Sequence, residues 1–523
     1  MINITDKSKC CGCRACEQAC PVGCISQEID SEGFNYPKVD AAKCINCGAC
    51  DKVCPIIVAE NKPKEDGPDY GIDAYGGWIT DEDVRQDSSS GGAFTALADS
   101  VLDEGGKVYG CYLDSDKKAV HIGIDSKDQV KILRGSKYVQ SDTLSVYSEI
   151  QELINSGRKV LFVGAPCQCA GLDAFIKKNR DKLFTVDFIC HGVPTPRLFA
   201  DYINSLESKK GSKITAFRFR NKDKGWNQSG LQLGTYYEFE DGSSVRNYPA
   251  FNDKFMNAFL DDIALRPCCY ECKFKSLPKY YADFTIADFW GVNHCNKELN
   301  DKKGTSLILV HSNRGKKFWE GVKSKFNCEK VDFKSSITKN PTIIKSVRRK
   351  KNRDKFFEDY NNYGYEYVEK KYMSAFTWAF HKCLNIALAL FNKFQQFIKF
   401  GIVGISNVVI CLLVYYVGIY FGLHYNLAYA IGFVVSVINA FYWNNKYVFK
   451  NKQETNTKKA FVKVFMSYGA SFLLSIAIMS FLVEIIGVPS FIAPILKMIV
   501  TIPINFVLNK VWAFKDRKVK SKA

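Results

Sequence analysis

Charged residues are missing from one long stretch near the end of the chain, and an apolar leader is missing from its beginning. Residues 401–445 contain no Asp, Glu, Lys or Arg, which excludes a solvated surface segment and predicts that the chain crosses a membrane there. The segment from Met1 to Lys9 is polar, so we expect no secretory signal peptide ahead of the first cysteines.

Net charge is missing from the first 344 residues, although the whole chain carries +18. Residues 345–523 hold 25 Lys and Arg against 8 Asp and Glu, which leaves 47 against 46 in the remainder. The basic excess therefore lies beside the uncharged stretch, as on the cytoplasmic side of a membrane protein. This placement argues against nucleic acid as a partner and favours inner-membrane lipids.

Cysteine, in contrast, is abundant, and ten of the 21 cysteines lie before residue 55. The spacing C-x2-C-x2-C-x3-C-P occurs twice, formed by Cys10, Cys13, Cys16 and Cys20 before Pro21, and by Cys44, Cys47, Cys50 and Cys54 before Pro55. Thiolates at this spacing bind two 4Fe-4S clusters, and the fourth cysteine of each run binds the cluster of the other run. We therefore assign Cys54 to the first cluster and Cys20 to the second.

Zinc sites or disulfides are the alternatives for these cysteines, but a zinc site needs only four ligands and no Cys-Pro ending. Cys11 and Cys24 fall outside the spacing and are expected to be small buried residues beside the clusters. Residues 1–58 resemble the two-cluster bacterial ferredoxins, and such clusters predict a reducing cytosol.

A polar Pro/Gly linker over 59–72 precedes residues 73–345, which have the alternating patterns of an α/β domain. We expect a helix over 93–104, strands over 107–112, 159–163 and 184–189, and a helix that follows residue 168 and runs to about residue 178. Ser90, Gly91 and Gly92 precede the first helix. Small residues there allow backbone N–H groups to approach a phosphate, although an ordinary serine cap explains the same letters.

Further cysteines follow the predicted strands. Cys167 and Cys190 come directly after two of them, and Cys269 and Cys272 form C-x2-C. Because α/β sheets bind ligands at the carboxyl ends of parallel strands, four thiols at this edge would hold a third 4Fe-4S cluster. Buried free cysteines or a zinc site remain possible. Alternative ligands are Cys169, Cys268 and Cys295.

Short motifs in a fixed order carry a resemblance to a known family. They are Ser89 to Gly92, Ser136 to Ser141, Gly164 to Gln168, Asp187 to Pro194, Arg266 to Lys275 and Ala287 to Gly291. On these motifs residues 1–345 resemble the beta-subunit family of coenzyme F-420-reducing hydrogenase and dehydrogenase. The resemblance implies FAD, the third cluster, hydride exchange at the flavin, and a soluble electron carrier such as coenzyme F-420 or ferredoxin.

The same resemblance suggests positions for flavin contacts. It directs Ser90, Gly91 and Gly92 towards the FAD phosphates, and places five residues in the flavin pocket: Lys137, Tyr138, Gln140, Pro166 and His191. His191 is the candidate catalytic proton donor, although a histidine in a packed loop is often only a hydrogen-bond bridge. The resemblance does not identify the hydride acceptor.

An aromatic region with strand alternation follows, and we expect it to form the core of a β-hairpin layer. Its members are Phe217, Phe219, Trp226, Tyr236, Tyr237 and Phe239. Arg218, Arg220 and Lys222 interleave with them and are expected on a solvated strand face, with an anionic cofactor tail as the alternative. Residues 346–396 form a basic linker, an irregular Tyr-rich part over 356–372, and an amphipathic interfacial helix over 373–397, for which a span is the alternative.

Four apolar spans end the chain, at about 400–421, 427–445, 464–486 and 490–509. Basic residues flank them on one side only, which predicts a multi-pass protein of the prokaryotic inner membrane with the redox domains and both termini in the cytoplasm. Residues 397–517 resemble the GtrA-like family, which is associated with moving polyprenyl-phosphate-linked sugars. Glu484 and Lys497 lie inside the spans, either as a pair or snorkelling, or with Lys497 holding a lipid phosphate.

The predicted architecture is an α/β redox domain preceded by a small α+β module for two 4Fe-4S clusters and followed by an all-α four-span membrane domain. The predicted function is an FAD and iron–sulfur dependent oxidoreductase acting in surface polysaccharide synthesis. A polyprenyl-phosphate-sugar flippase with an accessory redox domain and an electron-transfer adaptor are the alternatives.

Overall fold

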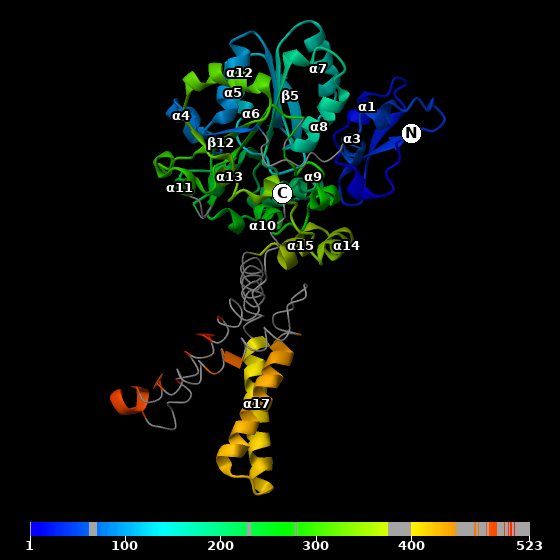
Figure 1. Ribbon diagram of the computed structural model, residues 1–523. Coiled ribbons are helices and arrows are strands. Elements are labelled where there is room, and N and C mark those ends of the chain that lie inside the picture. Colours follow the sequence, from blue (N-terminus) through cyan, green and yellow to red (C-terminus); the bar gives the residue numbers. More distant parts are fainter. Residues whose placement is uncertain are drawn as a thin grey trace, which may run out of the picture. The chain divides into compact units, whose positions relative to one another are not determined.

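The computed structural model divides the chain into two compact units, Met1–Ala379 and Phe380–Ala523, and each is described by itself (Figure 1). The described residues are 2–61, 71–226, 232–277, 279, 281–374, 399–444, 446, and, between 465 and 507, residues 465, 466, 469, 477, 478, 481–488, 496, 500, 503, 504 and 507.

The cysteine-rich module is built from a β-hairpin and short helices. Its elements are α1 (Ala15–Gln18), β1 (Ile25–Ile29), β2 (Asn35–Val39), α2 (Ala49–Lys52) and α3 (Pro55–Asn61), with β1 antiparallel to β2. The two cysteine runs repeat each other in backbone as well as in sequence. Gly12 and Arg14 have positive φ in the first run, and Asn46 and Gly48 have it at the corresponding places of the second. Each run therefore turns sharply twice, between its first three cysteines.

An eight-stranded sheet forms the centre of the first unit, in the order β13-β3-β12-β11-β7-β6-β4-β5. The strands are β3 (Asp73–Ile79), β4 (Lys107–Leu113), β5 (Ala119–Ile124), β6 (Val160–Val163), β7 (Leu183–Phe188), β11 (Phe284–Asp288), β12 (Ser306–Val310) and β13 (Phe326–Val331). Strands β4, β6, β7 and β11 are parallel neighbours. The prediction of a buried parallel strand at 159–163 is confirmed by β6, which lies between β4 and β7.

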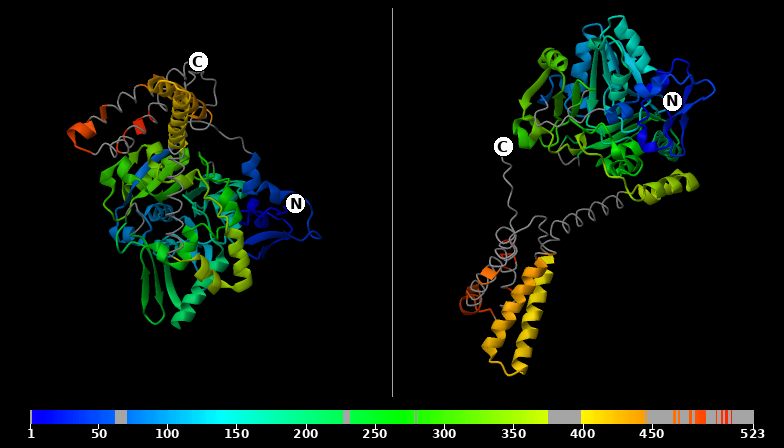
Figure 2. Two further views of the ribbon diagram at one scale, coloured as in Figure 1. Left: turned by 90° about the horizontal axis from the view of Figure 1, so that it is seen from below. Right: turned by 45° about the vertical axis from the view of Figure 1, so that its right-hand side comes forward.

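Helices cover both faces of this sheet because successive strand residues point to opposite sides. Leu161 packs with α5 (Ala93–Leu102) and α12 (Asn313–Val322). Its neighbour Phe162 packs with α7 (Val146–Asn155) and α8 (Pro166–Phe175). Buried cysteines of the N-terminal module belong to the same apolar cluster as Phe162, so this module packs on the face that carries α7 and α8, as Figures 1 and 2 show.

A smaller antiparallel sheet of β8 (Ile214–Asn221), β9 (Gly234–Phe239) and β10 (Ser244–Asn247) packs with α9 (Pro196–Lys210) and α10 (Lys254–Leu260). The rings of Phe217 and Tyr237 stack with centroids 5.7 Å apart. The predicted aromatic core of a hairpin is therefore confirmed for these two rings. Trp226 differs, because it is buried against Trp290, with centroids 5.1 Å apart.

The expectation of an irregular segment over 356–372 is wrong. Helices α14 (Arg353–Tyr363) and α15 (Tyr365–Tyr372) form there and are separated at Gly364, whose φ is +77°. Phe356 and Tyr360 are four residues apart on one face of α14, and both are fully buried in the cluster around the small sheet. Tertiary burial of this aromatic face stabilises a helix that its polar composition does not predict.

In the second unit, Lys399–Tyr420 is the one helix among the described residues that is long and apolar enough to cross a membrane. Gly422, with φ +80°, turns the chain into α17 (Tyr425–Trp443). These two helices correspond to the first two predicted spans. Most of 464–509, including Lys497, and nearly all of the amphipathic segment 373–397 lie outside the described residues, so the described chain contains one clear span instead of four.

Candidate functional site

The carboxyl ends of β6, β7 and β11 lie at one edge of the large sheet because these strands are parallel. Strand β3 ends at the same edge, since both β3 and β11 are antiparallel to β12. The loop after β6 leads through Pro166 into α8, and the loop after β7 contains Cys190 and His191. The sheet topology thus brings together loops that are far apart in sequence, at the place where α/β proteins bind ligands.

Six cysteines line one cavity at this edge, which we call the inner thiol cavity. They are Cys11, Cys167, Cys190, Cys268, Cys269 and Cys272. All four residues predicted to bind a third cluster are among them. Cys268, one of the alternatives, also lines the cavity, whereas Cys169 donates to the carbonyl oxygens of Gly164 and Val186. Cys295, at the end of α11 (Val292–Cys295), is not part of the lining.

The remaining lining of the inner thiol cavity is largely apolar, with Ile189, Val193, Phe274 and Ile343 in its wall. Burial raises the pKa of Cys190 to about 12 and that of Cys272 to about 11. Thiols of this kind stay neutral near pH 7 unless a metal supplies positive charge, and a coordinating thiol is deprotonated. Lys273, Lys275 and Lys279 also line the cavity, and no carboxylate does. Among the described residues no group of three or more His, Cys, Asp or Glu side chains is arranged to hold a metal ion, so the structure brings the predicted ligands to one cavity without forming a closed ligand set.

A second cavity lies in the cysteine-rich module, and we call it the first-cluster cavity. Its lining includes the four cysteines assigned to the first 4Fe-4S cluster: Cys10, Cys13, Cys16 and Cys54. Cys54 comes from the second run, so the structure brings the predicted fourth ligand to the cysteines of the first run. Ile2, Ile4 and Pro37 complete an apolar wall.

Cys11 and Ile56 line both cavities. The Cys11 side chain is within hydrogen-bonding reach of Cys13 on one side and Cys167 on the other. The side chains of Cys11 and Ile56 therefore form a wall that the two cavities share. Cys11 is buried, as expected, but its position between the two sites was not predicted. Its location between two ligands in Cys10-Cys11-Gly12-Cys13 was the only signal in the sequence.

The cysteines assigned to the second cluster have different surroundings. Cys47 is exposed, and Cys20 and Cys44 are half-buried. The Sγ atoms of Cys20 and Cys24 are 3.4 Å apart, and the Cys24 side chain also reaches Cys44. The Cys50 Sγ accepts a hydrogen bond from the Ile2 N–H at 3.4 Å. This group is thus the part of the cysteine array that meets solvent.

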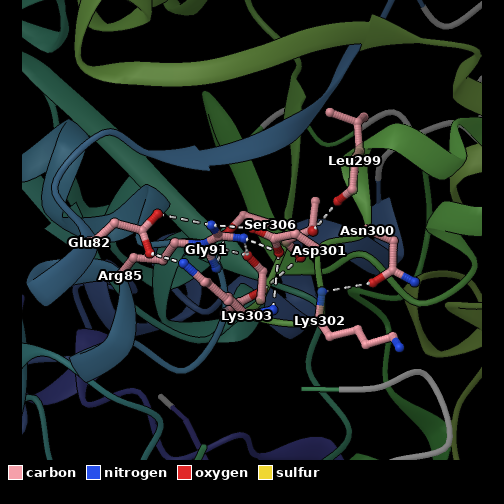
Figure 3. A network of polar contacts seen from close by, with 12 residues as sticks. Glu82, Arg85, Gly91, Leu299, Asn300, Asp301, Lys302, Lys303 and Ser306 are labelled. Atoms are coloured by element: carbon pink, nitrogen blue, oxygen red, sulfur yellow. Dashed lines mark hydrogen bonds and ion pairs between the residues drawn. The ribbon is translucent and has the colours of Figure 1, made fainter. Parts of the chain in front are cut away.

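The segment predicted to bind a phosphate is held by contacts within the protein (Figure 3). The Ser90 hydroxyl donates to the Thr305 carbonyl at 2.8 Å, and the Gly91 N–H donates to the Ser306 hydroxyl at 2.9 Å. A Cβ atom at Gly91 would lie 2.4 Å from the Gly77 carbonyl oxygen. Close packing therefore already explains this glycine, and its N–H group is occupied.

Arg85 holds the loop over residues 301–304, which leads into the Ser306 contact with Gly91. Its guanidinium binds Asp301 through two hydrogen bonds and the Gly304 carbonyl through two more, as Figure 3 illustrates for Arg85 and Asp301. Lys222 donates to three backbone carbonyls, among them that of Ser90 at 2.8 Å. The expected solvated strand face is therefore wrong for Lys222, which follows β8 and is 4 % exposed, because backbone carbonyls of three separate segments surround its ammonium group.

Arg220 contacts one of the other predicted flavin residues, Tyr138. It donates to the Tyr138 hydroxyl at 3.0 Å, to the Ser89 carbonyl at 3.3 Å, and to both oxygens of Asp288. Its side chain is 9 % exposed, so it too does not lie on a solvated face. The Arg220 Nε is buried without a hydrogen-bond partner among the described residues. A buried N–H without a partner could donate to a carbonyl or phosphate group of a bound flavin.

The other predicted flavin residues are placed differently. Lys137 donates to the carbonyl oxygens of Leu133 and Arg134, and burial lowers its pKa to about 8. Gln140 donates weakly to the Cys11 carbonyl at 3.4 Å and accepts from Arg266 at 3.0 Å. Pro166 lines the inner thiol cavity. The set therefore fits one flavin site only in part, around Arg220, with Gln140 and Pro166 beside the thiols.

His191 is held by a carboxylate that sequence patterns did not identify. Its Nε2 lies 2.5 Å from the Asp262 Oδ1, and its ring lies edge-on to Phe259 at 5.0 Å. Phe259 also stacks on Tyr138 at 4.7 Å, so His191 and the Arg220 group share one aromatic neighbour. Asp262 is 71 residues away from His191 in the chain, and no local motif joins them.

Family models match four parts of the chain. They describe a 4Fe-4S dicluster domain at residues 9–58, the N-terminal part of the coenzyme F-420 hydrogenase/dehydrogenase beta subunit at 74–148, the C-terminal part of the same subunit at 157–335, and a GtrA/DPMS transmembrane domain at 399–514. No curated relative matches the sequence.

Among solved structures, the chain is similar to one from the F-420-reducing nickel–iron hydrogenase complex of Methanosarcina barkeri. The identity is 17 %, over 55 % of this chain and 91 % of that chain, with a TM-score of 0.36. A TM-score of this size does not establish a shared overall arrangement.

Proposed function

We propose that the protein is a membrane-bound iron–sulfur flavoprotein oxidoreductase, because residues 74–148 and 157–335 match the two models of the coenzyme F-420 hydrogenase/dehydrogenase beta-subunit family. It would exchange electrons between a soluble carrier, either ferredoxin or the deazaflavin coenzyme, and a hydride acceptor. The matches to a dicluster domain and to a GtrA/DPMS transmembrane domain support the two ends of this proposal.

The observation that carries the proposal is the pair of thiol-lined cavities that share Cys11 and Ile56. A ferredoxin module that served only as a separate domain would not need to place its first cluster cavity against a second set of cysteines. The shared wall makes the two sets immediate neighbours. The inner set, in turn, lies in the loops at the carboxyl edge, where the Arg220 group and His191 are found.

The residues at this edge would bind and orient FAD. When bound, a flavin exchanges two electrons as a hydride and single electrons with an iron–sulfur centre. Arg220 would direct its unpaired Nε–H towards the cofactor while Asp288 holds the guanidinium in place. Asp262 fixes the His191 ring through Nε2, which leaves Nδ1 as the atom at which this residue would hold or transfer a proton.

We place the protein in the prokaryotic inner membrane, with several spans and a cytoplasmic redox unit. The acceptor would be a polyprenyl-linked or nucleotide-linked sugar in surface polysaccharide synthesis. The match at 399–514 also favours a second candidate, a polyprenyl-phosphate-sugar transporter with an accessory redox unit. An adaptor that only relays electrons is the third candidate.

Anaerobic purification of the full chain in detergent tests the redox proposal. We expect about twelve irons per chain, from three clusters, together with one flavin that is bleached by reduced ferredoxin or reduced deazaflavin. The variant Cys167→Ser should lose about four irons. Cys328→Ser is the matched control, because Cys328 lies in β13 away from both cavities.

Two outcomes would contradict parts of the proposal. Full iron content in the Cys167→Ser protein would remove the third cluster, and a flavin-free protein would remove the flavin. Transport is separated by measuring surface glycan in cells. Unchanged glycan in Cys167→Ser cells, together with its loss in Lys497→Ala cells, would favour the transporter.

A further inference from the structure

Arg266 is a fully buried cation at the contact between the cysteine-rich module and the α/β domain, with 0 % of its surface exposed. Its guanidinium donates to the Cys10 carbonyl at 2.8 Å, the Asn35 carbonyl at 2.8 Å and the Gln140 side chain at 3.0 Å. Its Nη2 also lies 3.6 Å from the Cys10 Sγ. The charge is therefore placed directly against a cysteine assigned to the first cluster.

No carboxylate forms an ion pair with Arg266 in the part of the chain that the structure describes. Two rings also lie beside it, that of Tyr36, with the guanidinium carbon 4.3 Å from the centroid, and that of Phe34, at 5.3 Å. Carbonyl and amide oxygens satisfy the N–H groups but do not neutralise the charge. A buried unpaired charge is costly, so such residues normally have a counter-charge.

A 4Fe-4S centre bound by four thiolates is an anion, and it gains one more negative charge when it accepts an electron. We propose that this anion is the counter-charge of Arg266, and that Arg266 sets the reduction potential of the centre to which Cys10 is assigned. The cation stabilises the reduced form more than the oxidised form, so it raises the potential. The proposal depends on the dicluster module and does not require FAD or a third cluster.

The simpler explanation is that Arg266 only attaches the module to the α/β domain. Arg353 provides the comparison, because it is also buried, at 1 % exposure, and also bridges to the module. It forms an ion pair with Glu32 at 2.5 Å and donates to the Leu265 carbonyl. It has a carboxylate partner, and none of its hydrogen bonds goes to a cysteine.

An electron paramagnetic resonance titration of the full-length protein tests the proposal. One electron passes from a low-potential titrant to each cluster, and the midpoints of the individual signals are compared. In Arg266→Gln, the reduction equilibrium of one cluster should fall by at least about tenfold, which is about 59 mV for a one-electron couple. In Arg353→Gln, all midpoints should stay at the wild-type values although the module is attached less firmly.

Two further variants keep the test decisive if Arg266→Gln does not assemble. Gln140→Glu places a carboxylate where the amide oxygen now accepts from Arg266, and should lower the same midpoint while the arginine remains. Arg266→Lys keeps the charge and should retain most of the wild-type potential. Wild-type midpoints in iron-loaded Gln140→Glu, or an equal fall in Arg353→Gln, would overturn the proposal.

Discussion

The two cysteine runs of the N-terminal module have the same spacing and the same two left-handed turns, yet they end in different surroundings. The cysteines assigned to the first cluster line one cavity, are mostly buried, and share a wall with the inner thiol cavity. Those assigned to the second cluster include the exposed Cys47. The spacing thus determines which cofactor a run binds. The position of the run on the α/β domain determines whether that cofactor lies next to the inner thiol cavity or near solvent.

Removing one ligand from each cluster should have the largest effect on the difference between the two runs. We expect both Cys54→Ala and Cys47→Ala to lose about four irons. In Cys54→Ala, the rate at which ferredoxin reduces the proposed flavin should fall by more than the roughly 10–100-fold that is typical of changes around a metal. The reason is that this substitution removes the cluster from the cavity at the shared wall. Cys47→Ala should slow the same reaction less, as measured by stopped-flow bleaching.

Reduction of the flavin by the deazaflavin should be unchanged in both variants, which provides the control. Equal effects of the two substitutions on the ferredoxin reaction would contradict the distinction between an inner and a solvent-facing cluster.

A fall in pH should lower the stability of the α/β domain in a way that the cysteine-rich module does not share. His121 is buried, and burial lowers its pKa from 6.5 to about 4. The unfolded chain therefore binds a proton between these values while the folded chain does not, so stability falls as the pH decreases from about 6.5 to 4, by roughly 3 kcal/mol. Residues 1–58 contain no histidine, so this loss belongs to the α/β domain.

The change His121→Phe keeps a ring beside Phe162, on which His121 stacks at 5.3 Å, and should flatten the slope of unfolding free energy against pH. His294→Phe is the control, because His294 is exposed. An unchanged slope in His121→Phe would show that His121 is not kept neutral by burial.

The smallest expected effect compares two glycines with the same φ of +69°, Gly12 and Gly48. An alanine at either position costs about 1–2 kcal/mol for the left-handed backbone. At Gly12 the added Cβ would also lie 2.5 Å from the Gln140 Nε2 and 3.0 Å from the Arg266 Nη1, whereas nothing lies within 4 Å at Gly48. Gly12→Ala should therefore lower the denaturation midpoint more than Gly48→Ala, and equal midpoints would argue against tight docking of the first run.

Local patterns were sufficient for features that depend on neighbouring residues. The cysteine spacing predicted the first-cluster set, including Cys54, and the apolar run at 159–163 predicted strand β6. The loops that follow β6 and β7 then brought Cys167 and Cys190 together, as the parallel arrangement requires. The match to the beta-subunit family confirms the resemblance on which the site prediction was based.

Features that depend on distant parts of the chain were not predictable in this way. Arg220 in β8 and Lys222 just after it alternate like a solvated face. Arg220 is instead held by Tyr138 and Asp288, and Lys222 by the carbonyl oxygens of Ser90 and Lys303. Cys11 looked like a spacer because the spacing rule concerns only its own run, whereas its second neighbour, Cys167, is on α8. In each case the deciding contact joins residues more than 65 positions apart, and a single sequence does not record such contacts.

The position of Cys47 has a consequence for handling the protein. A thiolate corner that reaches the surface is the first point at which dissolved dioxygen meets the metal array. Brief contact with air should therefore destroy the second cluster, to which Cys47 is assigned, before the first. The brown colour that remains longest should come from the centres on either side of Cys11.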